Sequence, residues 1–101
     1  MALNQRQPIL ICYDIADPKR LQRLHRQLAK QAVMVQYSVY YTEMRVVEIE
    51  CLKDMIRQYI DADHDDVRIY PLPDKIEITM IGLSATPSLS VLQRRAIVRK
   101  R

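Results

Sequence analysis

Asp14 is the residue of this sequence that is best placed to do chemistry, because it closes an apolar run at residues 9–13. The run lacks the alternation of a half-exposed strand, so we expect a central strand covered on both faces. A carboxylate at its end needs backbone amides, a basic side chain or a metal ion. Mg²⁺ and Mn²⁺ favour carboxylate oxygens, and a symmetric dimer would bring two copies of Asp14 together. Asp14 is therefore either a metal ligand or a carboxylate held by the following turn or a neighbouring arginine.

Few other side chains offer chemistry. Asp17 precedes Pro18, a pair that is typical of a helix start, so the expected role of Asp17 is to cap a helix. Ser38, His25 and His64 could be combined with an aspartate on paper, but their spacing does not indicate a nucleophile and its base. Both histidines are expected at the surface.

Several classes of site are excluded by composition. Gly82 is the single glycine, so glycine-rich phosphate and dinucleotide loops are absent. Cys12 and Cys51 have neither a disulfide pattern nor metal-ligand spacing, and we expect both as core residues in a reducing compartment. The acidic stretch 61–66 lacks the glycine and terminal glutamate of a calcium-binding EF-hand loop, so we expect a solvated turn.

Membrane association is not expected from this sequence. Residues 1–7 have no apolar signal core, and no apolar run approaches the roughly 20 residues that span a bilayer. The sequence therefore predicts a soluble, cytoplasmic protein without a membrane partner.

Positive charge is concentrated in two segments of the chain, whose formal net charge is +4. Residues 84–101 hold five basic residues and no acidic one. Residues 18–32 also lack acidic residues, and their basic side chains recur at nearly helical spacing: Lys19, Arg20, Arg23, Arg26 and Lys30. A merely solvated helix usually mixes both signs, so we interpret this stretch as a phosphate-binding surface.

Apolar periodicity predicts the elements that position Asp14. We expect helices over residues 18–31 and 45–60, and strand regions over 9–14, 33–42, 67–72 and 76–81. The region 33–42 is either one bent strand or two strands broken near Tyr37 and Ser38. This order predicts an α+β, ferredoxin-like βαββαβ sandwich with both helices on one face and an additional C-terminal strand.

The chain divides into a ferredoxin-like domain, residues 1–83, and a linker with a basic C-terminal tail, residues 84–101. The amino-acid composition changes at this boundary, from periodic apolar residues to a segment rich in serine, threonine and proline. We expect the tail to be disordered alone or to fold on a partner.

Four sequence segments together resemble the small CRISPR-associated protein of the spacer-acquisition machinery, the dimeric partner of the CRISPR integrase. They are Tyr13-Asp14-Ile15, Asp17 with the helix that carries Lys19-Arg20, Val35-Gln36-Tyr37-Ser38-Val39-Tyr40 and the strand segment at residues 66–72. The resemblance extends from about residue 8 to residue 82. It implies a ferredoxin-like homodimer with the integrase, duplex DNA and, as a further candidate, RNA as partners.

The resemblance also implies a site. Asp14 matches the family's aspartate, where one carboxylate from each subunit can hold Mg²⁺ or Mn²⁺ for endonuclease chemistry. Four further residues match positions associated with that site: Tyr13, Arg23, Ser38 and Tyr40. Many relatives carry arginine where this chain has Met34, which argues more against cleavage than against DNA binding.

Three functions follow as hypotheses. The favoured one is a DNA-binding scaffold in a CRISPR integration complex. The second is metal-dependent nuclease activity, either this protein's own or that of a stand-alone, toxin-like endoribonuclease of the same fold. The third is a ferredoxin-like interaction module that binds no nucleic acid. No aromatic pair indicates base stacking, so we expect duplex to be recognised by shape and charge.

Overall fold

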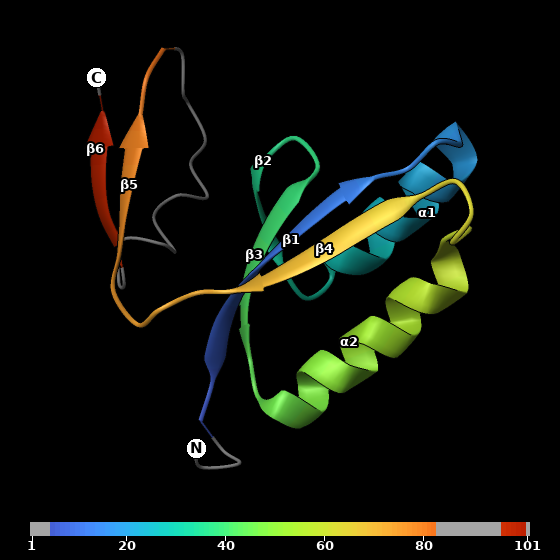
Figure 1. The fold of residues 1–101 in the computed structure, drawn as a ribbon, viewed down its shortest axis with the longest axis horizontal. Helices are drawn as coiled ribbons and strands as arrows, with labels where there is room; N and C mark the ends of the chain where they lie inside the picture. Colours follow the sequence, from blue (N-terminus) through green and yellow to red (C-terminus); the bar gives the residue numbers. More distant parts are fainter. Residues whose placement is uncertain (1–4, 83–95, 101) are drawn as a thin grey trace.

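A computed structural model describes residues 5–82 and the backbone of residues 96–100. Its elements follow in the order β1 (Gln7–Asp14), α1 (Pro18–Ala29), β2 (Val33–Gln36), β3 (Val39–Met44), α2 (Val46–Tyr59), β4 (Asp66–Pro71), β5 (Ile76–Met80) and β6 (Ala96–Lys100). The first four strands form an antiparallel sheet in the order β2-β3-β1-β4. Both helices lie on the same side of this sheet (Figure 1). The predicted ferredoxin-like α+β fold is confirmed.

Helix α1 begins where its sequence predicts. The Asp17 carboxylate accepts a hydrogen bond from the backbone N–H of Arg20 at 3.0 Å, and Pro18 takes the first helical position. Proline has no N–H to leave unsatisfied there, so the pair makes a stable start. The capping role expected for Asp17 is confirmed. The helix ends at Ala29, two residues before the predicted end.

The region 33–42 forms two strands, so the alternative with a break near Tyr37 and Ser38 is the right one. Ser38 adopts a φ of 62°, in the left-handed region that non-glycine residues rarely enter. Its carbonyl oxygen accepts a hydrogen bond from the backbone N–H of Tyr13 at 3.1 Å. This bond ties the β2–β3 turn to the end of β1.

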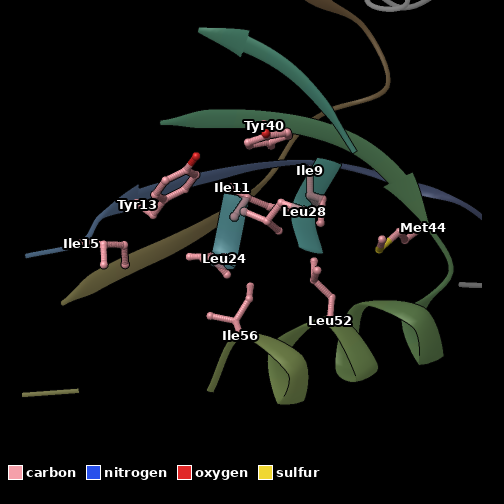
Figure 2. Packing of buried hydrophobic residues seen from close by; sticks show 10 residues of the cluster. All are labelled: Ile9, Ile11, Tyr13, Ile15, Leu24, Leu28, Tyr40, Met44, Leu52 and Ile56. Carbon is pink, nitrogen blue, oxygen red and sulfur yellow. The ribbon is translucent and has the colours of Figure 1, made fainter. Parts of the chain in front are cut away.

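The hydrophobic core lies between the sheet and the two helices. Ile9 and Ile11 of β1 are at most 1% exposed and pack against leucines of both helices, Leu24, Leu28 and Leu52 (Figure 2). Truncating one such leucine to alanine typically costs about 2–5 kcal/mol. This core fixes the face of β1 that points inward.

The expectation that β1 is covered on both faces is wrong for the described part of the chain. Residues on the helix side are buried, whereas Leu10 and Cys12 on the other side are only half-buried and Asp14 is exposed. We call this second side the outer face. A continuous apolar run does not distinguish a doubly covered strand from one whose second face awaits a partner.

Strands β5 and β6 form a separate, two-stranded parallel sheet away from the main one (Figure 1). Strand β5 alternates half-buried and exposed residues, as predicted for residues 76–81. Residues 96–100 of the predicted tail form β6, whereas the rest of that segment and the boundary at residues 83–84 lie outside the described residues. Among the described helices, none is long and apolar enough to cross a membrane.

Candidate functional site

The candidate site is an open hollow of about 240 Å³ at the end of β1 that carries Asp14. Three segments form it: the end of β1, the β2–β3 turn and the start of β4. The lining side chains are Cys12, Tyr13, Asp14, Tyr37, Ser38, Val39, Asp66 and Arg68. Of the residues that the sequence analysis associated with a dimer site, Tyr13, Asp14 and Ser38 meet here.

Asp14 and Asp66 are direct neighbours across the β1–β4 ladder, so their side chains start from the same face of the sheet. Asp66 accepts a hydrogen bond from Nε of Arg68 at 2.9 Å, and both side chains are well exposed. Within residues 5–82, no hydrogen bond or ion pair engages the Asp14 carboxylate. A cation could therefore approach Asp14 without displacing a protein partner.

The metal donors of one chain are too few for a closed metal site. Among the described residues, no group of three or more histidine, cysteine, aspartate or glutamate side chains could hold an ion. Asp14 and Asp66 supply hard oxygen donors of the kind that Mg²⁺ and Mn²⁺ prefer. The residues thus fit such an ion only where two copies of the chain contribute together.

Tyr13 separates this hollow from the core. Burial, together with the nearby Tyr40 and Tyr37, raises the pKa of Tyr13 to about 12, although a hydrogen bond with Ser38 acts in the other direction. Tyr13 therefore stays neutral at physiological pH and can donate a hydrogen bond but not act as a base. Its ring centroid lies 6.2 Å from that of Tyr40 in a stacked arrangement.

Tyr40 does not line the hollow. It is 1% exposed on the helix side of the sheet, and its hydroxyl lies 2.8 Å from Nδ1 of His25. His25 is half-buried by this contact, so the expectation of a surface histidine is wrong for it. The expectation is confirmed for His64, which is exposed and pairs with Asp61 at 2.9 Å. Cys51 is exposed and Cys12 half-buried, so neither is the core cysteine that was expected.

The acidic loop contains a buried carboxylate, which corrects the expectation of a fully solvated turn. The Asp65 side chain has no exposed surface and receives a two-pronged contact from Arg20, at 2.9 and 3.1 Å. It also accepts hydrogen bonds from the backbone N–H groups of Ala16 and Asp61, at 2.9 and 2.8 Å. Arg20 and these amides hold the pKa of Asp65 well below its ordinary value. We call this arrangement the Asp65 clamp.

The basic residues predicted to bind nucleic acid separate into two groups. Arg20 belongs to the Asp65 clamp, with its side chain 28% exposed. The other four are exposed and recur every three or four residues, which places them on one stripe of α1: Lys19, Arg23, Arg26 and Lys30. Within residues 5–82, none of these four forms an ion pair with a carboxylate. We call them the α1 basic stripe.

Sequence reasoning missed Tyr37, Asp66 and Arg68 as members of the site. The alternation of Asp66, Val67 and Arg68 could have shown that both charged residues share a face of β4. Their position beside Asp14 could not be read, because it depends on the pairing of strands 52 residues apart.

Comparisons with known proteins agree with this geometry. The sequence model of the family described as "CRISPR associated protein Cas2" matches residues 7–78. A protein of Nitrosomonas europaea named "CRISPR-associated endoribonuclease Cas2 1" is 46% identical over 79 residues, which cover 77% of this chain and 74% of the relative. A protein of Thermodesulfovibrio yellowstonii, "CRISPR-associated endoribonuclease Cas2 2", is 41% identical over 78 residues, covering 77% and 86%.

A solved structure supports the same relationship. Streptococcus pyogenes Cas2 superposes with a TM-score of 0.61 at 28% sequence identity, covering 65% of this chain and 86% of that protein.

Proposed function

This chain belongs to the CRISPR-associated Cas2 family, and we propose that it is a homodimeric nucleic-acid-binding scaffold for the CRISPR integrase in spacer acquisition. The α1 basic stripe carries this proposal. Four exposed cations without carboxylate partners in the described chain form a surface suited to a phosphate backbone. Contacts of this kind supply affinity and position a duplex without reading its sequence.

The outer face of the sheet supports the dimer. Leu10 and Cys12 leave apolar surface there beside Asp14, whereas the helix side is closed. Strands β5 and β6 pair only with each other among the described strands. A two-stranded sheet alone is marginally stable, so these strands gain most from further chain to pair with. A second subunit would cover the outer face and give β5 and β6 further strands to pair with.

A second function, metal-dependent endonuclease activity, is favoured by the exposed Asp14 carboxylate. Two subunits related by a two-fold axis near Asp14 would present two copies each of Asp14 and Asp66 to one Mg²⁺ or Mn²⁺ ion. Such an ion would supply charge stabilisation and an activated water. Tyr13, hydrogen-bonded to Ser38, would hold the β2–β3 turn beside Asp14.

The test measures duplex DNA binding and cleavage on the same preparations. Wild type should bind a labelled duplex with an affinity that falls as salt rises. Each phosphate contact should add about −0.9 to the slope of log affinity against log salt concentration. Asp14→Asn should bind the duplex at least as well, because it removes a negative charge. Metal-dependent cutting that is present in wild type and lost in Asp14→Asn supports the nuclease as well as the scaffold.

Three results would count against these functions. Weak binding of duplex that does not respond to salt favours the interaction module without nucleic acid. Cutting that persists in Asp14→Asn removes Asp14 from the chemistry. A light-scattering mass of one subunit at micromolar concentration contradicts the homodimer.

A further inference from the structure

Tyr37 is the most exposed aromatic side chain of the described residues, at 77%. Its neighbours in sequence show the contrast, since Tyr40 and Tyr41 are 1% exposed. The Tyr37 ring therefore does not pack in the core, and most of its surface is accessible to a planar partner. Tyr37 lines the same hollow as Asp14, so a partner on its ring would lie at the candidate site.

The backbone around Tyr37 is fixed even though its side chain is free. Tyr37 and Ser38 connect β2 to β3 directly, with Gln36 paired to Val39. Ser38 holds a left-handed φ of 62°, and its carbonyl accepts from the N–H of Tyr13. Strained residues of this kind persist where the surrounding structure over-determines them. The turn thus holds Tyr37 at a set position beside the end of β1.

The hollow is small and open. Its volume of about 240 Å³ lies below the usual range for drug-sized ligands, about 300–1,000 Å³, so it suits one group of a larger ligand rather than a whole enclosed molecule. It brings together an aromatic ring at Tyr37, a carboxylate at Asp14 and the ion pair of Arg68 with Asp66. A planar base suits the ring, and a phosphate bridged by a divalent cation suits the carboxylate.

We propose that Tyr37 stacks on one unpaired nucleobase and places its nucleotide beside Asp14. The inference rests on the proposed nucleic-acid binding and names its substrate at this point: a single strand, or a frayed end of a duplex. Inside a closed duplex the faces of the bases are covered by neighbouring pairs, so away from the duplex ends only an unpaired base can stack on the ring. Recognition here goes beyond the shape and charge reading expected from the sequence.

Fluorescence anisotropy with matched oligonucleotides tests the stacking. The probes are a labelled single-stranded DNA of mixed sequence, the same strand with abasic sugars throughout, and an intact duplex. Tyr37→Ala should weaken binding of the base-bearing strand by roughly 5- to 100-fold, the range found for loss of one stacking contact. Tyr37→Phe should bind as wild type. Val47→Ala, which removes an exposed side chain of α2 that does not line the hollow, is the control and should be neutral.

A single-tryptophan reporter gives a direct readout, because the chain has no tryptophan. In Tyr37→Trp the indole should be quenched by the base-bearing strand and not by the abasic strand. An unchanged affinity in Tyr37→Ala, or an equal loss on the abasic strand, overturns the inference.

The remaining outcomes separate this inference from the proposed function. If Tyr37→Ala still binds duplex with the wild-type salt dependence while single-strand binding is unaltered, the scaffold stands and the stacking fails. If wild type binds none of the three probes at low salt, both fail. If Tyr37→Ala alters the light-scattering mass, the ring contacts a second copy of the chain and the stacking assignment is wrong.

Discussion

Two carboxylates lie at the same end of the sheet in opposite surroundings. The Asp65 side chain is fully buried, receives four hydrogen bonds and joins three segments of the chain. Asp14 is exposed, and its side chain has no partner within residues 5–82. Burying a charge is tolerable only when partners satisfy it, so Asp65 must serve the fold. An exposed carboxylate on a rigid strand end costs the fold little and is free to act on something else.

The difference divides this small region into a closed part, the Asp65 clamp, and an open part, the hollow around Asp14. The clamp holds Ala16 and Asp61, which flank the strand ends that carry Asp14 and Asp66. Changes in the clamp should therefore alter stability first. Changes in the hollow should alter cleavage or binding and leave stability unchanged.

The largest expected effect comes from the open part. Asp14→Asn should lower metal-dependent cleavage by at least about 100-fold on the substrate that wild type cuts, because it removes a charged metal ligand without altering shape. The midpoint of thermal unfolding should stay within about 2 °C of wild type, since no described contact is lost. Cleavage rates in Mn²⁺ and a thermal melt of the same sample measure both. A large loss of stability in Asp14→Asn would mean that Asp14 also stabilises the fold.

The converse change is in the clamp. Asp65→Asn should lower the midpoint of thermal unfolding by about 5–10 °C, because the half-buried Arg20 loses its charged partner. Asp63→Asn, an exposed carboxylate of the same loop, is the matched control and should change the midpoint little. Circular dichroism melts give both values. Similar midpoints of thermal unfolding for the two variants would show that Asp65 does not have the structural role assigned to it.

Low pH should remove the stabilisation that the Asp65 clamp gives to the fold. Arg20 lowers the pKa of Asp65 in the folded chain, so the clamp stabilises above the ordinary carboxyl pKa of 3.8 and loses its effect as pH falls below it. The difference in melting midpoint between wild type and Asp65→Asn should therefore be constant from pH 7 to pH 5 and narrow by pH 2.5. A difference that widens in acid would contradict the lowered pKa of Asp65.

The overall fold was more accessible to sequence reasoning than either the Asp65 clamp or the hollow around Asp14. The Asp17–Pro18 start of α1 and the leucine spacing are local signals, so the helices, strands and ferredoxin-like order could be predicted. Asp65 looked like a solvated loop residue, because its partner Arg20 lies 45 positions away. Long-range pairing of this kind leaves no local pattern.

The geometry of the hollow around Asp14 could not be predicted, because the turn and the uncovered strand face that form it leave no pattern in the sequence. Ser38 makes a left-handed turn without glycine, so neither the break between β2 and β3 nor the exposure of Tyr37 had a turn signal. The apolar run of β1 indicated burial on both sides, whereas the described chain covers only one. Whether a second subunit covers the other is information that a single sequence does not hold.

The smallest expected effect tests whether the α1 basic stripe is distinct from the clamp beside it. Arg23→Gln should weaken duplex DNA binding about three- to tenfold at low salt and lower the salt dependence by the equivalent of about one phosphate contact, with an unchanged melt. Arg57→Gln, which removes an exposed arginine of α2 that already pairs with Asp54, is the control and should bind as wild type. Titration of a labelled duplex at three salt concentrations gives the slopes. Equal losses in both variants would mean that net charge, rather than the stripe, attracts the duplex.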